Sequence, residues 1–172
     1  LGFFSNDFKI NSVSFFLENI IYKIDKNKFE LHAISNLEID KHDEMTHDLK
    51  KIFDSWHDTV NLLDGEFIKL TRSLNLDILF DLSGYFSGNR VQAFRARCAP
   101  VQISWLGYCN SLGIKNMDYL IADENLILTN EQDQYSEKIV YMPNTWSTIS
   151  LPKNLDQIII KLNNQEKNFT YG

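Results

Sequence analysis

The chain has few cysteines, no cluster of basic residues and no long apolar run. Its two cysteines, Cys98 and Cys109, lack the spacing of a metal site or a redox motif, and they are too few for a disulfide framework. No apolar run approaches the roughly 20 residues of a membrane span, and no signal peptide is visible. These absences predict free thiols, no membrane partner and a cytoplasmic location.

The charge balance is acidic. Seventeen Lys and Arg residues stand against 23 Asp and Glu residues, a formal net charge of -6. A nucleic-acid partner is therefore not expected, because such proteins carry a basic patch. The four histidines have no zinc-ligand spacing, and no Gly-x-Ser-x-Gly elbow occurs, so we predict neither a metal site nor a serine nucleophile.

What is present is enough apolar sequence for one domain. With 172 residues, 44% of them hydrophobic, the chain can bury a core of its own. It begins without Met on a strand-like segment, and residues 169–172 resemble the start of another strand. We therefore expect a fragment of a longer protein, with one domain over residues 1–152 and a linker leading into the next domain over residues 153–172.

Apolar periodicity predicts strands alternating with helices. The expected helices cover residues 14–26, with Ser12 or Ser14 as N-cap, 41–53, 64–74, with Asp64 as N-cap, and 89–97; residues 156–167 read as a weak helix or linker. The expected strands are residues 1–5, 29–34, 77–82, 101–105, 119–122 and 138–142. This alternation predicts an α/β fold with a Rossmann-like, doubly wound parallel sheet.

Residues 77–113 contain the most informative pattern. Two expected strands end in glycine loops there, at Gly84 and at Gly107, and such strand ends are where α/β proteins bind ligands. The loop is neither a GxGxxG nor a Walker motif, and an ordinary strand-to-helix turn explains it equally well. Three arginines of this stretch, Arg90, Arg95 and Arg97, can be read as a ligand-binding group, or at least two of them as ion-paired surface residues.

Asp7 directly follows the first expected strand. At that place its carboxylate would face a ligand bound at the carboxyl edge of the sheet. The alternative interpretation is an aspartate that closes an Asx-turn or caps the next helix.

Five collinear segments together resemble a known family. They are GFFSNDF at 2–8, DILFDLSGYFSGNR at 77–90, APVQISWLGY at 99–108, MDYLIAD at 117–123 and QYSEKIVYMP at 134–143. The chain is thereby similar to the N-terminal catalytic half of the O-linked N-acetylglucosamine transferases. The resemblance implies the N-terminal lobe of a GT-B glycosyltransferase, which transfers N-acetylglucosamine from UDP-N-acetylglucosamine to Ser or Thr of an acceptor protein. It further implies inversion, no metal, no cofactor beyond the UDP-sugar substrate, a second lobe carrying most nucleotide contacts, and upstream tetratricopeptide repeats.

The resemblance also implies roles for individual residues. Asp7 matches an aspartate near the proton-transfer path, and Asn11 stands where relatives carry a histidine. Leu106 and Gly107 match a pair that lines the donor site, whereas Cys109-Asn110 replaces a Pro-Gly pair. We predict Asp7 and Asn11 as catalytic residues and, as substrate-binding residues, Val13, Gly84, Tyr85, Leu106, Gly107 and Tyr108.

Asn11 leaves alternatives open, because an amide cannot accept a proton as imidazole does near neutral pH. One alternative is a non-catalytic module that binds a protein partner. Another is a related glycosyltransferase that uses UDP-glucose and an asparagine acceptor.

Overall fold

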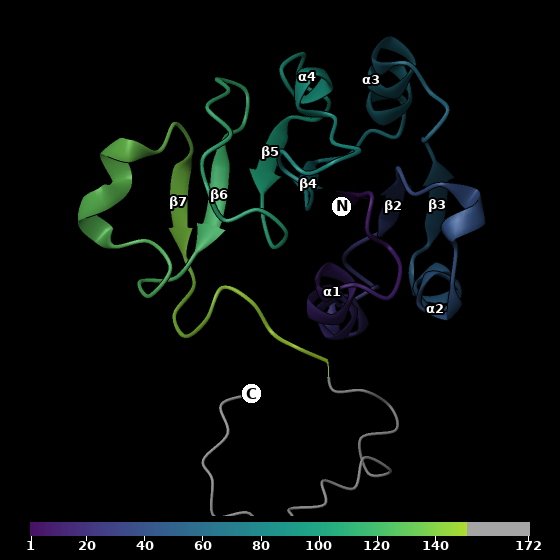
Figure 1. Ribbon diagram of the computed structural model, residues 1–172, viewed down its shortest axis with the longest axis horizontal. Coiled ribbons are helices and arrows are strands. Elements are labelled where there is room, and N and C mark those ends of the chain that lie inside the picture. The colour runs from purple at the N-terminus through teal and green to yellow at the C-terminus, as the bar shows by residue number, and fades with distance from the viewer. Residues whose placement is uncertain (151–172) are drawn as a thin grey trace, which may run out of the picture.

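The computed structural model describes residues 1–150, which form a seven-stranded parallel sheet (Figure 1). The strands are β1 (Gly2–Ser5), β2 (His32–Ser35), β3 (Ser55–Asp58), β4 (Ile78–Asp81), β5 (Val101–Ser104), β6 (Tyr119–Ala122) and β7 (Lys138–Tyr141). Their order is β3-β2-β1-β4-β5-β6-β7, and every neighbouring pair is parallel. The chain therefore builds one half of the sheet outward from β1 and the other outward from β4, which confirms the doubly wound Rossmann-like fold.

Within residues 1–150, four α-helices cover the two faces of the sheet in pairs (Figure 1). They are α1 (Ser12–Lys23), α2 (Glu44–Ile52), α3 (Asp64–Ser73) and α4 (Val91–Phe94), with 3-10 helices η1 (Ile39–Lys41) and η2 (Thr129–Gln134). The first two pack with Phe3 and Leu82 in one buried cluster. The last two pack with Phe4 and Leu79 in a second cluster, on the other face. Alternate residues of each central strand thus point to opposite cores, as a sheet buried on both faces requires.

Helix α1 begins where the sequence allows an N-cap, but at a different residue from the one expected. Asn11 is extended and its side-chain oxygen accepts the N–H of Val13 at 3.0 Å, so the prediction of Ser12 or Ser14 as N-cap is wrong. The helix then buries Val13, Leu17 and Ile21, which are four residues apart and share one face.

Helix α3 corrects a second cap. Leu63, not Asp64, is the residue that precedes the helix, and its N–H is bound by the Glu66 carboxylate at 2.9 Å. Asp64 instead accepts a hydrogen bond from Arg90. The predicted N-cap Asp64 is therefore the first residue of the helix, and its side chain binds Arg90 instead of capping α3.

Three elements were missed, namely β3 and the two 3-10 helices η1 and η2, and others are shorter than predicted. Strand β3 has the sequence SWHD, which is polar and only partly buried because β3 is an edge strand, so it lacks the apolar alternation that identified the other strands. Helix η2 was also not predicted. The helix expected over 89–97 is reduced to the four residues of α4. The segments predicted at 153–172 and 156–167 lie outside the described residues.

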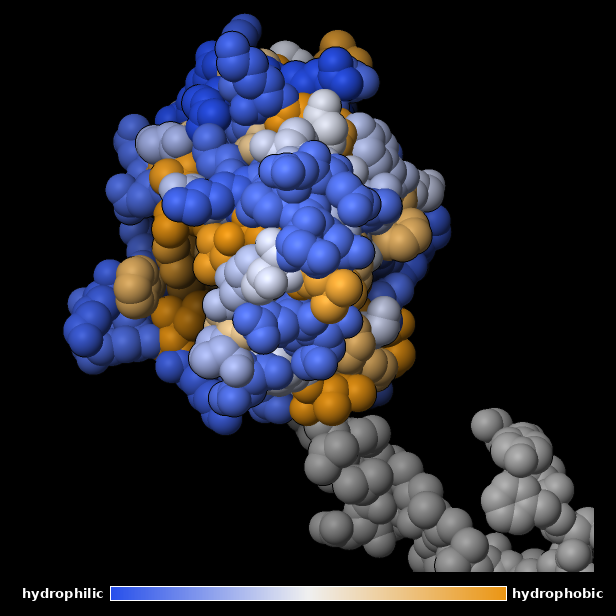
Figure 2. All heavy atoms as spheres, turned by 90° about the vertical axis from the view of Figure 1, so that its left-hand side faces the viewer, coloured by the Kyte–Doolittle hydropathy of each residue, from blue (hydrophilic) through white to orange (hydrophobic). Residues whose placement is uncertain are grey.

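The segment after β7 returns across the sheet toward α1 (Figure 1). The Trp105 indole N–H donates to the Trp146 carbonyl at 2.9 Å, and the Ser150 N–H donates to the Phe15 carbonyl at 2.8 Å. Seen from the β7 side, the surface is largely hydrophilic with scattered hydrophobic patches (Figure 2). Within residues 1–150, no helix has both the length and the apolar character needed to cross a membrane.

Candidate functional site at the carboxyl edge of the sheet

The sheet changes winding direction between β1 and β4, which are adjacent in the sheet although residues 6–77 separate them in the chain. In open α/β sheets, ligands bind outside the carboxyl ends of the strands at such a switch point. The loops that meet there follow β1, β4 and β5. They contain seven of the eight predicted site residues. The eighth, Val13, lies in the first turn of α1.

The loop after β5 has a strained backbone. Leu106 has a φ of 75°, and the Gly107 N–H donates across it to the Trp105 carbonyl at 3.0 Å, which makes a γ-turn. A side chain at Gly107 would place its Cβ 1.9 Å from the Leu82 carbonyl oxygen and 3.2 Å from Val13. Backbone strain of this kind persists only where surrounding structure holds it, and it concentrates at binding sites. The fold thus places Leu106, Gly107 and Val13 next to one another, and their predicted role in binding substrate stays a prediction.

The loop after β4 packs against the loop after β5 through Gly84. This glycine has a φ of 54°, and a Cβ there would lie 2.3 Å from the Tyr108 side chain. The Tyr85 ring stands edge-on to Tyr108 at 5.7 Å, and its hydroxyl donates to the Leu112 carbonyl at 2.6 Å. Phe86 contacts Tyr108 in the same way, at 5.9 Å. These aromatic rings form a fixed, partly exposed wall.

The backbone of Asp7 forms hydrogen bonds, whereas its carboxylate forms none with residues 1–150. Its N–H donates to Ser5 Oγ at 2.9 Å, and its carbonyl accepts the Ser14 hydroxyl at 2.8 Å. Within residues 1–150, no hydrogen bond reaches the carboxylate, so the Asx-turn and capping alternatives do not describe it. Burial raises the pKa of the Asp7 carboxyl above its ordinary value, and the charge of Lys9 lowers it by less. Such a carboxylate is free to accept a proton.

Asn11 has a structural task that the sequence did not reveal. Its side-chain oxygen caps α1 through the Val13 N–H. Its predicted catalytic role stays a prediction.

Arg90 joins its own loop to the loop after β2 and to the connection between β3 and α3, contacts that sequence reasoning missed. Its guanidinium binds Asp64 at 2.9 Å, the Asn36 side chain at 3.1 Å and the carbonyls of Thr59 and Leu62 at 2.9 and 2.8 Å. Its side chain is only 11% exposed. The expectation that at least two of the three arginines are ion-paired is confirmed by this contact and by the pair between Arg97 and Asp118, but Arg90 is a nearly buried connector rather than a surface residue.

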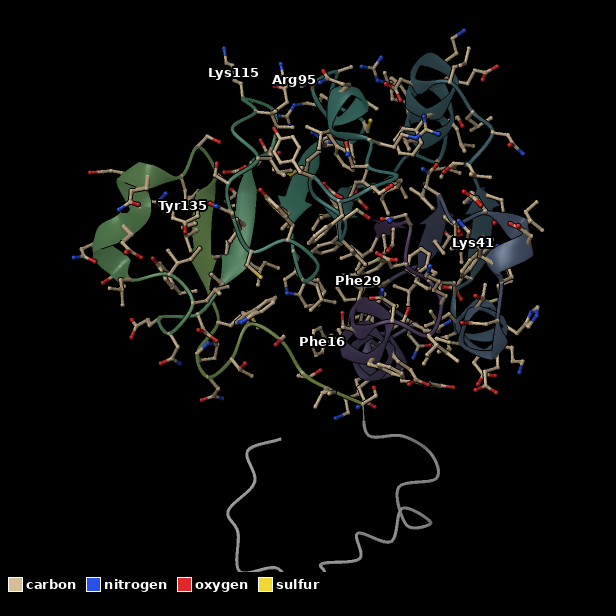
Figure 3. All side chains as sticks on the ribbon, in the orientation of Figure 1. Phe16, Phe29, Lys41, Arg95, Lys115 and Tyr135 are labelled. Atoms are coloured by element: carbon tan, nitrogen blue, oxygen red, sulfur yellow. The ribbon has the colours of Figure 1, made fainter. Side chains whose placement is uncertain are left out.

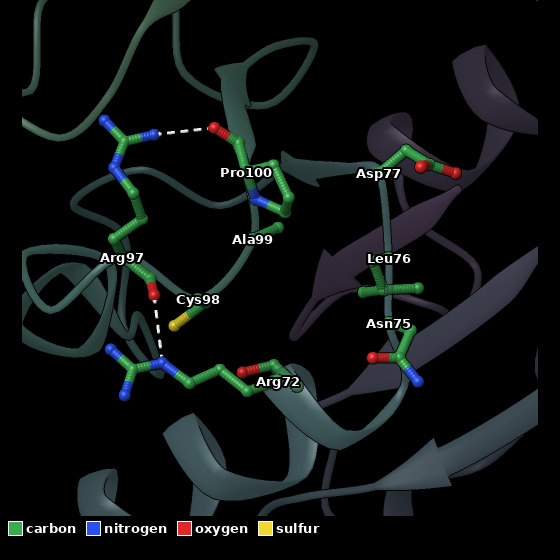
Figure 4. Close-up of a pocket in the computed structure, with 9 residues that line it drawn as sticks. Arg72, Asn75, Leu76, Asp77, Arg97, Cys98, Ala99 and Pro100 are labelled. Carbon is green, nitrogen blue, oxygen red and sulfur yellow. Dashed lines mark hydrogen bonds between the residues drawn. The ribbon is translucent and has the colours of Figure 1, made fainter.

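The opposite edge of the sheet has a cavity of about 370 Å³ (Figure 4). The two arginines that line this cavity, Arg72 and Arg97, donate hydrogen bonds to backbone carbonyls of the chain. Arg72 binds the Arg97 carbonyl at 3.2 Å, and Arg97 binds the Pro100 carbonyl at 2.9 Å. This edge holds the amino ends of the strands, away from the switch point, so we place the candidate site at the carboxyl edge. Among residues 1–150, no three His, Cys, Asp or Glu side chains are grouped so as to hold a metal ion.

Together, the strand order and the loops at the switch point define a Rossmann-like α/β domain of the kind that forms a lobe of GT-B glycosyltransferases. Comparison with known sequences makes this specific. The profile of glycosyl transferase family 41 matches residues 1–169, and the chain belongs to that family.

Named relatives agree with this assignment. The chain is 29% identical over 147 residues to a probable UDP-N-acetylglucosamine–peptide N-acetylglucosaminyltransferase SPINDLY of Arabidopsis thaliana, covering 83% of this chain and 16% of the relative. It is 27% identical over 150 residues to the UDP-N-acetylglucosamine–peptide N-acetylglucosaminyltransferase of Caenorhabditis elegans, covering 85% of this chain and 13% of the relative. The chain therefore spans only a small part of the curated relatives it matches.

A solved structure shows the same fold. A mutant O-GlcNAc transferase of Thermobaculum terrenum superposes with a TM-score of 0.85 at 33% identity, covering 90% of this chain and 29% of that one. The predicted resemblance to the O-linked N-acetylglucosamine transferases is confirmed.

Proposed function

We propose that this chain is the N-terminal catalytic lobe of a protein O-glycosyltransferase. In the parent protein, a Ser or Thr hydroxyl of an acceptor protein attacks the anomeric carbon of a UDP-sugar, the bond to the UDP oxygen breaks, and the sugar configuration inverts. The named relatives act with UDP-N-acetylglucosamine on peptides, which supports this sugar as donor and a polypeptide as acceptor. The proposal requires no metal, and it leaves most nucleotide contacts to a second lobe of the parent chain.

The observation that carries the proposal is the free, half-buried carboxylate of Asp7 at the switch point. Its raised pKa makes it a better proton acceptor than an exposed aspartate. At the same edge of the sheet, Leu106 has a strained backbone with a φ of 75°, and Val13 lies against Gly107. In this arrangement Asp7 takes the acceptor's proton, and the turn after β5 positions the donor.

The test uses the parent protein with radiolabelled UDP-N-acetylglucosamine and a panel of acceptor peptides. Asp7→Asn removes the proton acceptor with little change of shape, and we expect kcat to fall by roughly 100-fold or more with a small change in the KM of the donor. Asp77→Asn, which changes an exposed carboxylate before β4, is the matched control and is expected to retain the rate. Equal rates for the wild type and Asp7→Asn would contradict the assignment of Asp7.

The helix-capping contact of Asn11 favours one other candidate, a family member that binds a protein partner without transferring sugar. An amide committed to the N-terminus of α1 supplies no proton transfer. Absence of transfer by the wild-type parent protein with every UDP-sugar and peptide tested, while an acceptor protein still binds, would favour this candidate. A panel containing UDP-glucose and asparagine-bearing peptides distinguishes a third outcome, a different donor and acceptor.

A further inference from the structure

Residues 108–112 form an arch in the loop after β5, and Tyr85 contacts both of its ends. The tip of the arch, Cys109-Asn110, is exposed, whereas Leu112 is 2% exposed and belongs to the second buried cluster. At one end, the Tyr108 ring meets the Tyr85 ring edge-on at 5.7 Å. At the other end, the Leu112 carbonyl accepts the Tyr85 hydroxyl at 2.6 Å. The orientation of Tyr85 therefore depends on where Leu112 lies.

A buried carboxylate fixes the Leu112 end of the arch. Glu137 directly precedes β7 and is 1% exposed. Its Oε1 accepts the Leu112 N–H at 2.8 Å, and its Oε2 accepts the hydroxyls of Ser111 at 2.6 Å and Ser136 at 3.0 Å. Both backbone groups of Leu112 are thus bound by side chains from distant parts of the chain, the N–H by Glu137 and the carbonyl by Tyr85.

The three groups that donate to the Glu137 carboxylate are neutral. Burying a carboxylate costs solvation free energy, which hydrogen bonds offset when their geometry is well defined. An apolar side chain at this position would avoid that cost, but it would leave the buried Leu112 N–H without this partner. The arrangement is therefore better suited to selecting one loop conformation than to adding stability.

Other groups hold the rest of the same loop. Ile114 and Met117 are 2% and 1% exposed in the second buried cluster. Close to the start of β6, the Gln102 side chain donates to the Asn116 carbonyl at 2.5 Å, and the Gln102 N–H donates to the Asp118 carboxylate at 2.8 Å. Loss of the Glu137 carboxylate is therefore expected to release the arch and to leave the fold in place.

We propose that Glu137 is a positioning residue for the donor side of the transfer reaction. It fixes Leu112, Leu112 holds the Tyr85 hydroxyl, and the Tyr85 ring supports Tyr108, which directly follows the Leu106–Gly107 turn. The inference rests on the proposed function, in which that turn positions the donor. It adds a residue that acts through the loop, and it assigns the Tyr85 hydroxyl to the protein, so that a bound substrate meets the ring of Tyr85.

The first experiment measures amide hydrogen exchange in the parent protein, without substrate, in peptides that contain Leu112. Glu137→Ala removes the acceptor of the Leu112 N–H, and we expect exchange there to accelerate by roughly 10-fold or more. Glu137→Gln keeps an acceptor oxygen for that N–H, and its amide donates to the hydroxyl oxygens of Ser111 and Ser136, so it is expected to retain most of the protection. Unchanged exchange in Glu137→Ala would overturn the proposal at its first step.

Glu131→Ala is the matched control. The Glu131 carboxylate lies in η2 and accepts the Leu128 N–H at 3.0 Å, so this variant also deprives a backbone N–H of a carboxylate, but away from the arch. It is expected to leave both the exchange at Leu112 and the transfer kinetics as in the wild type. Equal acceleration at Leu112 in Glu131→Ala and Glu137→Ala would show general destabilisation and would overturn the specific role of Glu137.

The second experiment separates KM from kcat in the parent protein with UDP-N-acetylglucosamine and an acceptor peptide. A loosened donor site weakens binding in the ground state and the transition state alike. We therefore expect Glu137→Ala to raise the KM of the donor by about 10-fold, with kcat changed by less than about 3-fold and the KM of the peptide unchanged. Glu137→Gln should stay close to the wild type. A lower kcat at constant donor KM would indicate a smaller fraction of folded enzyme, and it would overturn the positioning role.

Tyr85→Phe tests the second step, because it removes the hydroxyl and keeps the ring. If Glu137 acts through Leu112 and Tyr85, the rises in donor KM caused by Glu137→Ala and Tyr85→Phe are not multiplicative in the double variant. Multiplicative effects would overturn this route. A wild-type parent that transfers no sugar refutes the proposed function, and the positioning role with it, whereas the exchange data still decide whether Glu137 holds the arch.

Discussion

The two thiols of the chain occupy opposite environments. Cys98 is 1% exposed under α4, whereas Cys109 is exposed directly after Tyr108 in the loop that follows β5. Burial raises the pKa of both thiols. Each thiol is therefore protonated, and so unreactive, to a greater extent than the thiol of a free cysteine. Cys109 is therefore a slow but accessible label beside the candidate donor site.

We expect a maleimide to add once to the native chain, at Cys109, and twice to the urea-unfolded chain. Intact mass and peptide mapping check this result. Cys109→Ser is the control, and it should leave the native chain unlabelled. Native labelling of Cys98 would show that the packing of α4 against the sheet is looser than described.

Among the elements, the connections that follow β2 and β3 are held to the segment before α4 by Arg90. Its side chain bonds groups that follow β2 and β3 and the first residue of α3. Its guanidinium also lies over the Phe67 ring, 5.4 Å from the centroid. The helix pair on this face is thereby tied to the strand ends.

Arg90→Ala is expected to lower the free energy of unfolding by about 3 kcal/mol, because it leaves several nearly buried acceptors unpaired. Arg95→Ala is the matched control, since Arg95 is exposed and its side chain points to solvent (Figure 3); its effect should stay within about 0.5 kcal/mol. Urea unfolding at pH 7 measures both. Equal effects of the two substitutions would contradict the connecting role.

The junction between β4 and the β5 loop requires a glycine. Gly107→Ala would force Cβ against the Leu82 carbonyl, at 1.9 Å, so the two loops must separate. We expect a loss of about 2 kcal/mol in unfolding free energy and a weaker affinity of the parent protein for the UDP-sugar. Gly65→Ala in α3, where nothing lies within 4 Å of the new Cβ, is expected to be neutral or stabilising by roughly 0.5–1 kcal/mol. A Gly107→Ala variant as stable as the wild type would show that the loops are not in this contact.

At the scale of the whole molecule, the chain is short beside the proteins that it matches. It covers 16% of the SPINDLY relative and 29% of the solved transferase chain. We expect the isolated chain to fold, with a cooperative urea transition, and to transfer no measurable sugar, because the proposed second lobe supplies most of the nucleotide site. Scintillation counting of acceptor peptide measures the transfer, with the parent protein as the positive control. Measurable transfer by the isolated chain would sink the two-lobe proposal.

Local residue patterns predicted most of the strands and helices. They failed where an element or a side chain depends on residues that are far away in the sequence. Six of the seven described strands contain apolar segments that can be recognised in the local sequence. The glycines after β4 and β5 indicate where the carboxyl edge of the sheet lies. Strand β3 is polar, because an edge strand buries little, and only its pairing with β2 reveals it. Asp64, which was expected to cap α3, binds Arg90 instead, and Asn11, for which a catalytic role was predicted, caps α1 in place of Ser12 or Ser14.

The sequence by itself determined the α/β class, the family resemblance and the positions of the strand-end loops, because apolar periodicity and glycine placement are local properties. Only the tertiary structure decided which side chains meet there. It brought Gly107 onto Leu82, gave Arg90 its partners from three other elements, and left the second oxygen of Asp81 without one. The contacts of Gly107 and Arg90 join residues 25 to 54 positions apart in the chain, from Gly107–Leu82 to Arg90–Asn36, and local sequence patterns do not encode such distances.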